Sequence, residues 1–260
     1  MRFVVGMETS GRTRDAFRSR GYDALSVDLL PAQTEGPHIQ GDVFEYLASQ
    51  PPFTAGVFHP DCTYHTLSAA WAFKDPDFVK YPGVGYHQRV AESTLTGAAR
   101  RAARAEAEED VLRLRYLPFF KVLENPKGTL PRILGRAHDI VQPYEFGADA
   151  SKATCLWFFD ENGEPAPRVL RRRAESYVKP RLNCSSCGSN NPYEAAFETG
   201  CVFCGSEPAA LKPRWSNQTD SGQNNLSPGA KRWQARSDTY PGIAEGLAGA
   251  VLEAVGADLA

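Results

Sequence analysis

The sequence predicts an α/β fold that is built on a largely parallel sheet. Along the first 160 residues, short apolar runs of β character alternate with segments of helical character. Strands that alternate with helices at this spacing are typical of a parallel sheet with crossover helices. The chain has 260 residues, of which 42% are hydrophobic. That is enough for one large α/β domain, or for one domain with a small additional module.

The expected elements follow one another closely in the first half of the chain. Gly21 closes the first helix, because glycine favours the left-handed conformation in which helices often end. Asp42 lies in a turn that precedes a short helix. Strands are expected at 2–7, 22–31, 54–60 and 119–126, and helices at 12–21, within 38–49 and at 96–117.

Polar residues gather at the carboxyl ends of these strands, where parallel sheets bind their ligands. The segments that fall there are Glu8–Gly11, Asp28, Asp42, His59–Cys62 and Glu124–Pro126. Because the carboxyl ends of parallel strands meet at one edge of a sheet, we expect these segments to converge on a single site.

The rest of the chain is less regular. Residues 63–96 form a long loop rich in aromatic residues, and a loop of this length is commonly a lid or a binding element. The next helix carries three arginines near its start, and a basic run, RVLRRR, occupies 168–173. Each is either a solvated face or a basic surface that meets phosphates. An amphipathic helix within 239–256 closes the chain.

The composition limits the class of protein. The net charge is −2, so any basic surface for nucleic acid must be local. No apolar run approaches the length of a membrane span, and the N-terminus lacks the features of a signal peptide. We therefore expect a cytoplasmic monomer with no membrane partner. Disulfides are rare in that compartment, so the six cysteines are expected to be thiols or metal ligands.

Four of these cysteines have the spacing of a metal site. Cys184, Cys187, Cys201 and Cys204 form the pattern C-x2-C-x13-C-x2-C, and a glycine follows each pair. Each C-x2-C pair can place two thiolates on one ion, and two pairs complete a tetrahedral zinc site. Because all four positions are filled by protein, the pattern predicts a structural zinc rather than a catalytic one.

The first strand ends in a motif that suits a nucleoside-containing cofactor. GMETSG precedes a helix, and Asp28 ends the next strand, where an acid can accept hydrogen bonds from ribose hydroxyls. The chain has no G-x-G-x-x-G at this position, so a dinucleotide is not indicated. A smaller adenosine-bearing ligand such as S-adenosylmethionine fits better.

Seven segments then suggest a family. In chain order they are ETSG, SVDLL, GDVFEYL, HPDC, LENP, QPYEFGADASKATCLWF and SDTYPGIAEGLA. Together they resemble the ordered motifs of the DNA cytosine-5 methyltransferases, and most closely the compact form carried by phages and prophages. The resemblance covers most of residues 1–160 and returns at 236–250. The interval between corresponds to the family's variable target-recognition region and contains the four cysteines.

The resemblance implies a Rossmann-like, S-adenosylmethionine-dependent methyltransferase fold with a small zinc-ribbon insert. Residues 1–160 would form the catalytic core with the long loop 63–96, residues 161–235 the zinc-ribbon, target-recognition-like insert, and residues 236–260 a segment that returns to the core. The implied enzyme transfers a methyl group to carbon 5 of cytosine in DNA, in the cytoplasm of a bacterial host. The target base would be flipped out of a duplex or taken from a single strand.

The resemblance also implies roles for single residues. Cys62 would add to carbon 6 of cytosine, because thiolate addition turns the ring into an enamine-like nucleophile. Glu124 would hold the ring at N3, Asn125 would orient the loop, and Lys152 is the nearest match to an arginine of the family. The methyl donor's pocket would be lined by Glu8, Ser10, Gly11, Asp28, Leu29, Asp42 and Pro60, with Thr239 closing it from the C-terminal segment.

Two other functions remain open at this point. An exocyclic-amino methyltransferase would carry Asp/Asn/Ser-Pro-Pro-aromatic at the strand end, where this chain has Cys62 in the fourth position. A catalytically inactive zinc-ribbon nucleic-acid-binding protein is the other alternative. It is kept open by Asp61, since a carboxylate beside a thiol raises the thiol pKa.

Overall fold

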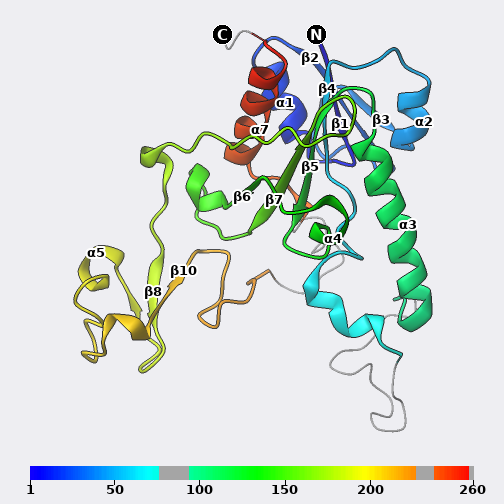
Figure 1. Cartoon of the computed structure of the whole chain (residues 1–260). Helices are drawn as coiled ribbons and strands as arrows, with labels where there is room; N and C mark the ends of the chain where they lie inside the picture. The colour runs from blue at the N-terminus through cyan, green and yellow to red at the C-terminus, as the bar shows by residue number, and fades with distance from the viewer. Residues whose placement is uncertain (76–93, 227–236, 258–260) are drawn as a thin grey trace.

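The computed structural model describes residues 1–75, 94–226 and 237–257. The predicted loop 63–96 therefore lies partly outside the described residues. Seven strands form one sheet in the order β3-β2-β1-β4-β5-β7-β6 (Figure 1). The strands are β1 (Arg2–Gly6), β2 (Asp23–Asp28), β3 (His38–Gln40), β4 (Ala55–Phe58), β5 (Phe120–Pro126), β6 (Asp139–Val141) and β7 (Thr154–Phe159).

The sheet is mostly parallel, as the sequence predicts. Strands β3, β2, β1, β4 and β5 pair in parallel, and β7 runs antiparallel to both β5 and β6. The order is that of the Rossmann fold, 3-2-1-4-5-6, with β7 inserted between the last two strands. The order reverses between β1 and β4, and the crevice beyond the carboxyl ends at such a reversal is where open α/β sheets bind ligands.

Helices cover both faces of the sheet, as Figure 1 shows. Successive side chains of a strand point to opposite faces, so Val5 joins one core with α1 and α7, while its neighbour Val4 joins the other core with α2, α3 and α4. The helices are α1 (Arg12–Arg18), α2 (Val43–Ala48), α3 (Gly97–Arg115), α4 (Pro131–Leu134) and α7 (Pro241–Ala254). Among the described residues, no helix has both the length and the apolar character to cross a membrane.

Two strands differ from the sequence-based expectation. Residues 38–40 were predicted as part of a turn but pair with β2 as the short edge strand β3. The apolar pattern did not indicate β6, which has only three residues. Both elements are short edge strands that depend on pairing with a neighbour. Cys155 lies inside β7 and is 3% exposed, so it is a buried strand cysteine.

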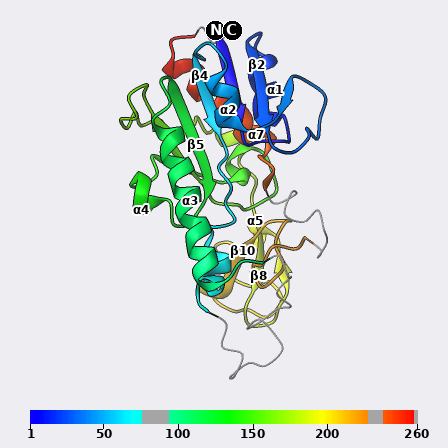
Figure 2. The same cartoon turned by 90° about the vertical axis from the view of Figure 1, so that its right-hand side faces the viewer.

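The four-cysteine segment forms a separate small sheet with the order β10-β8-β9. It consists of β8 (Arg181–Cys184), β9 (Asn190–Asn191) and β10 (Leu211–Arg214), with the short helix α5 (Tyr193–Ala196) packed on it. Figures 1 and 2 place this sheet at the end of the molecule opposite the N-terminus, on the side toward which β1 runs. The segment thus lies beyond the carboxyl edge of the main sheet.

The chain between β7 and the small sheet returns over the core. Leu170 is buried against α7, and Arg172 forms ion pairs with Asp139 at 2.9 Å and with Glu145 at 3.1 Å. Arg171 pairs with Glu253 at 3.0 Å. These two arginines of the basic run therefore form ion pairs within the protein, which accounts for them without a phosphate contact.

Helix α7 completes one core although it is far from the rest of that core in sequence. Leu247 is fully buried among residues of α1 and the sheet. We expect Leu247→Ala to lower the free energy of unfolding by about 2–5 kcal/mol, through lost burial and the cavity left behind. Gly249→Ala is the matched control in the same helix, since a Cβ there meets nothing within 4 Å. It should raise stability by up to about 1 kcal/mol. Urea denaturation measures both, and a cost below about 1 kcal/mol for Leu247→Ala would contradict this packing.

Candidate functional site

A cavity of about 570 Å³ opens at the carboxyl edge of the sheet, at the reversal between β1 and β4. The ends of β1, β2, β4 and β5 contribute to its wall, together with the loop before β7 and residues just before α7. The lining residues are Met7, Glu8, Thr9, Ser10, Asp28, Leu29, Leu30, Gly41, Asp42, Val43, Phe44, His59, Pro60, Asp61, Cys62, Thr63, Asp110, Glu124, Asn125, Pro126, Lys152, Ser237 and Asp238. The predicted convergence of strand ends is thus found in the structure.

The turn after β1 forms one side of the cavity. Met7 has a positive φ of 60°, a conformation that costs energy in a residue other than glycine and is often kept at functional sites. The Ser10 hydroxyl donates to one carboxylate oxygen of Glu8, whereas the other oxygen, Oε2, is buried without a partner among the described residues. Gly11 does not line the cavity. It begins α1 with φ 71°, and a Cβ there would lie 2.3 Å from the Thr34 hydroxyl, so it shapes the turn from behind.

The ends of β2 and β3 form the next part of the wall. Asp28 Oδ1 accepts from the backbone N–H of Leu30 at 2.8 Å. Asp42 also has a structural task, because its Oδ1 accepts from the N–H groups of Phe44 and Glu45 and so caps α2. Leu29 is a large apolar side chain that lines the cavity yet is 67% exposed. Such a side chain can be covered by an apolar or aromatic ligand surface.

Cys62 lies in the turn that follows β4, with its carbonyl accepting from the N–H groups of His65 and Thr66. Two contacts join this turn to the end of β5 and to the chain that follows it. Asn125 Nδ2 donates to the Pro60 carbonyl at 2.7 Å, and Thr66 forms an isolated bridge with Gly128. A Cβ on Gly128 would lie 2.0 Å from the His65 carbonyl oxygen, so only glycine fits there. The ends of β4 and β5 are therefore fixed against each other.

The arginines at the start of α3 also support the Cys62 turn. Arg100 Nη2 donates to the Thr63 carbonyl at 2.7 Å, and Arg104 Nε donates to the Tyr64 carbonyl at 2.8 Å. Both guanidinium groups lie over the ring of Phe73, Arg104 at 3.5 Å and Arg100 at 5.0 Å from its centroid. These contacts within the protein explain why arginine is present at positions 100 and 104, so neither a solvated helix face nor a phosphate contact is needed to explain them.

A buried ion pair connects the ends of β4 and β5. His59 Nδ1 and Glu124 Oε2 are 2.9 Å apart, and their side chains are 9% and 8% exposed. Burial alone would lower the pKa of His59, but the hydrogen bond and charge of Glu124, with a contribution from Glu8, raise it above its ordinary value. Burial alone would raise the pKa of Glu124, but the hydrogen bond and charge of His59, with Lys152 and Thr154, lower it. Each group therefore favours the charged form of the other.

The thiol of Cys62 is protonated at neutral pH in this arrangement. Burial raises its pKa, the charges of Asp61 and Glu124 raise it further, and Lys152 acts in the opposite direction. The Asp61 carboxylate is held by its own turn, because its Oδ1 accepts from the N–H of Thr63 at 2.9 Å and from the Thr63 hydroxyl at 2.6 Å. Any substrate that the Cys62 thiolate attacks must therefore favour the formation of this thiolate from the thiol.

Lys152 connects the cavity to the C-terminal segment, and its neighbour Ser151 contacts the chain that follows β10. Its Nζ donates to the carbonyls of Ser237 and Asp238, at 3.4 and 3.2 Å. The preceding residue, Ser151, is held by the Asn217 amide through two bonds of 2.9 Å, one to its N–H and one to its carbonyl. Thr239 is buried beside this segment but does not line the cavity, and its carbonyl accepts from Arg12 at 2.5 Å.

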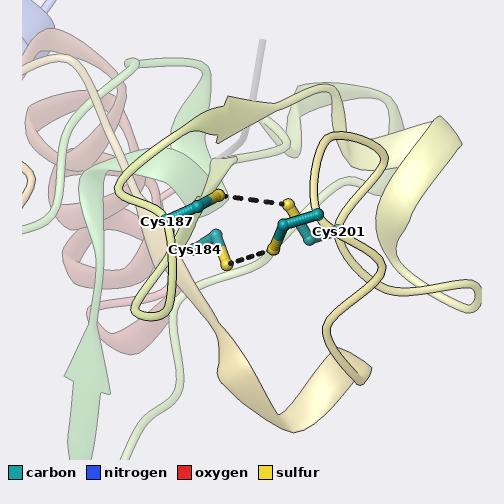
Figure 3. A group of neighbouring side chains, drawn as sticks. Cys184, Cys187 and Cys201 are labelled. Atoms are coloured by element: carbon teal, nitrogen blue, oxygen red, sulfur yellow. Dashed lines mark hydrogen bonds between the residues drawn. The ribbon is translucent and has the colours of Figure 1, made fainter.

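The four predicted metal ligands are brought together, and Figure 3 labels three of them, Cys184, Cys187 and Cys201. The Cys184 and Cys204 sulfurs are 3.8 Å apart, those of Cys187 and Cys201 are 3.6 Å apart, and all four lie within 4.8 Å of one another. Tetrahedral zinc with Zn–S bonds of about 2.3 Å requires sulfur separations of about 3.8 Å. The backbone N–H of Cys187 lowers the pKa of the Cys184 thiol, which favours the ligating thiolate. The group could therefore hold one metal ion, consistent with structural zinc.

Most predicted site residues lie at this cavity. All four proposed catalytic residues line it, and so do six of the eight proposed cofactor residues, leaving Gly11 and Thr239 just behind its wall. The sequence analysis did not find the pairing of His59 with Glu124, although both lie at predicted strand ends. Parallel neighbours β4 and β5 bring such residues side by side, but the strand order that makes them neighbours is not visible in a single sequence.

Comparison of the chain with models of known protein families gave no match, and a search of curated proteins likewise found no relative.

The ion pair makes a specific prediction about His59. In the Glu124→Gln variant, the pKa of His59 should fall, because burial then acts with little opposition. Histidine titration by NMR measures this change. His138 is the internal control: its pKa is lowered by burial alone, and it should titrate identically in both proteins. An unchanged His59 pKa in the variant would show that the two side chains are not paired in solution.

The same pair gives stability a defined pH window. His59 has a raised pKa, so its contribution is complete below 6.5 and is lost as pH rises through the folded-state value. Glu124 has a lowered pKa, so its contribution is complete above 4.5 and is lost as pH falls through the folded-state value. The pair therefore stabilises the fold most between these two values.

The cysteine cluster predicts a metal content. Protein purified without chelator should contain about one zinc ion per chain, as one tetrahedral four-thiolate site requires. Cys184→Ser should release the metal and expose residues 181–214 to proteolysis, because the small sheet has little apolar core of its own. Cys62→Ser is the matched control and should keep its zinc. Metal analysis that finds no zinc in the wild-type protein would rule out this assignment.

Proposed function

We propose that the protein is an S-adenosylmethionine-dependent methyltransferase that acts on carbon 5 of cytosine in DNA. The observation that carries the proposal is the cavity at the strand reversal. It brings Cys62 and Glu124, from the ends of neighbouring strands, into one wall with Glu8, Asp28 and Leu29. The two groups assigned to the base and those assigned to the methyl donor thus face one space, although they come from four separate segments of the chain.

The sheet supports this class of enzyme. Its order is compatible with a Rossmann-like fold, with the antiparallel strand β7 between β5 and β6. The turn after β1, which carries Glu8 and Ser10, and the end of β2, which carries Asp28, lie where such sheets bind the nucleoside part of a ligand.

The charges of the cavity fit this methyl donor better than a dinucleotide. Its lining includes seven carboxylates, those of Glu8, Asp28, Asp42, Asp61, Asp110, Glu124 and Asp238, whereas only Lys152 and His59 can be positive. A pyrophosphate would meet strong repulsion in such a wall, whereas a ligand with sulfonium and ammonium charges would not. When bound, S-adenosylmethionine supplies an electrophilic methyl group.

Single residues fit parts of the same ligand. Asp28 uses one carboxylate oxygen for the N–H of Leu30, which leaves the other for ribose hydroxyls. Glu8 Oε2 is buried without a partner among the described residues and can accept from an ammonium group. The exposed Leu29 side chain offers an apolar surface for the adenine ring.

The chemistry explains why a thiol and a carboxyl should meet there. Carbon 5 of cytosine is a poor nucleophile. A thiolate that adds at carbon 6 pushes electron density onto carbon 5 and N3, so the ring can then attack a methyl group. Cys62 supplies the sulfur, Glu124 faces the developing charge on the ring, and Asn125 fixes the two strand ends through its bond to Pro60. Lys152 lowers the pKa of Cys62 against the effect of burial and so favours the thiolate.

The small sheet is suited to contact DNA beside the cavity. We propose that the cysteine cluster holds structural zinc and that the insert, beyond the carboxyl edge of the core, lies against the nucleic acid. A base inside a duplex cannot reach a half-buried thiol in the wall of a cavity, so the target cytosine must be flipped out or already unpaired. Asn217 connects the insert to the loop that carries Lys152.

The proposal predicts that cofactor binding and chemistry can be separated by substitution. Cys62→Ser should abolish methylation while S-adenosylmethionine binds nearly as before, because the thiol acts on the base. Asp28→Ala should weaken S-adenosylmethionine binding by at least about tenfold, through lost hydrogen bonds to ribose. Calorimetry measures binding, and mass analysis of nucleosides from treated DNA measures the product.

The same product analysis decides between the alternatives. 5-Methylcytosine supports the proposal, an N-methylated base would identify an exocyclic-amino methyltransferase, and the absence of any methylated base together with DNA binding would identify an inactive binding protein. Calorimetric binding of NAD without binding of S-adenosylmethionine would contradict the assigned cofactor.

A further inference from the structure

The ion pair of His59 and Glu124 has a chemical consequence for the base. Both side chains line the cavity. A hydrogen bond of 2.9 Å joins His59 Nδ1 to Glu124 Oε2. The other ring nitrogen of His59, Nε2, is buried without a partner among the described residues. The imidazole is therefore anchored at one nitrogen by the group that is proposed to hold the base.

Cytosine presents two different atoms to such a carboxyl group. Its N4 amino group is a donor, and its N3 is an acceptor. A carboxylate can accept from N4 but offers no hydrogen to N3, and its charge opposes the negative charge that N3 gains when sulfur adds at carbon 6. Glu124 therefore needs a proton when the base is attacked, yet by itself the charged pair keeps that proton on His59.

We propose, on the basis of the proposed function, that His59 is the proton store for Glu124, and that the proton N3 gains during the attack comes from His59 Nδ1. Starting from the Cys62 thiolate, a sulfur electron pair forms the S–C6 bond. The C5=C6 π pair moves to C4–C5, and the C4=N3 π pair moves to N3. N3 takes a proton from the Glu124 carboxyl, which receives the Nδ1 proton, and His59 becomes neutral.

The proton returns in the next step, so the pair is unchanged overall. When carbon 5 forms its bond to the methyl group, the electrons of the N3–H bond restore C4=N3, and the proton passes back through Glu124 to His59. His59 contacts the ring only through Glu124 in this scheme. It is thus a positioning residue that sets the protonation state of the base-holding group.

The surroundings of His59 support this role. Charged groups from four elements face it: Glu124 from β5, Glu8 from the turn after β1, Asp28 from β2, and Lys152 from the loop before β7. Three of them are carboxylates that favour a proton on the imidazole, and only Lys152 opposes it. Because Glu124 is the one bonded to Nδ1, it is the group to which that proton can move.

Exchange of the hydrogen on carbon 5 tests the proposal without the methyl donor. Addition of Cys62 alone makes carbon 5 basic, so the enzyme should exchange this hydrogen for solvent deuterium in a random-sequence oligonucleotide, as read by mass spectrometry. His59→Asn keeps a donor near the Nδ1 position but carries no titratable proton. We expect its exchange rate to fall by on the order of 10²-fold at neutral pH.

The pH profile separates proton storage from a structural role. In His59→Asn the proton must reside on a carboxyl, so the limb of the profile that belongs to the pair should move to lower pH. His138→Asn, outside the cavity, should leave the profile unchanged. A rate within twofold of wild type, or a fall by the same factor at every pH, would overturn the role of His59 while leaving the methyltransferase proposal intact. A wild-type protein that neither exchanges nor methylates would overturn both.

A second measurement leaves His59 in place. In the wild-type protein without the methyl donor, NMR should show that His59 loses its positive charge in the adduct that Cys62 forms with carbon 6 of a bound cytosine oligonucleotide. The Cys62→Ala protein, which cannot form the adduct, should keep the charge on His59 when the same oligonucleotide binds. The wild-type protein should keep it when uracil replaces cytosine, since uracil already carries a hydrogen on N3. A charged His59 in the wild-type cytosine adduct would contradict the proposal even if His59→Asn fails to fold.

Discussion

The junction between the ends of β4 and β5 is the constraint on which the cavity depends. Two contacts form it, the bond from Asn125 to the Pro60 carbonyl and the buried pair of His59 with Glu124. Removing one partner of a buried ion pair typically costs about 3–5 kcal/mol, because it leaves an uncompensated charge. The sheet can therefore keep two charged groups at its edge only while both strand ends hold their relative position. That position also brings Cys62 and Glu124 into one wall.

Other parts of the protein reinforce the same junction from outside. The bridge between Thr66 and Gly128 joins the two loops beyond the strand ends, and Arg100 and Arg104 reach from α3 to the carbonyls after Cys62. On the opposite side, Asn217 fixes the backbone of Ser151 next to Lys152. The small cysteine-bearing sheet is thus connected to the cavity by hydrogen bonds, in addition to the stacking of Tyr144 on Trp215 at 4.1 Å. A change in the position of the insert would therefore shift the backbone next to Lys152.

Much of the core could be predicted from the sequence, because its signals are local. The alternation of apolar runs with helical segments indicated β1, β2, β4 and β5, and polar residues at their ends indicated the site. The cysteine spacing indicated the cluster. The short edge strands β3 and β6 could not be predicted, because three residues are too few to show a pattern. These strands form only through pairing with a neighbouring strand. The partners of His59, Arg100 and Arg172 likewise follow from tertiary placement. The family resemblance supplied the roles of Cys62 and Glu124, and the structure adds that both face one cavity.

Covalent capture of the base tests the central claim most directly, namely that Cys62 and Glu124 act on one base in this cavity. A cytosine with fluorine on carbon 5 cannot lose that atom as a proton, so an enzyme that has attacked carbon 6 and transferred a methyl group stays bound. Wild-type protein incubated with S-adenosylmethionine and a random-sequence oligonucleotide containing 5-fluorocytosine should form a covalent complex, and peptide mass spectrometry should place the added mass on Cys62. Absence of the complex, with DNA and cofactor both shown to bind, or attachment at another cysteine, would contradict the account.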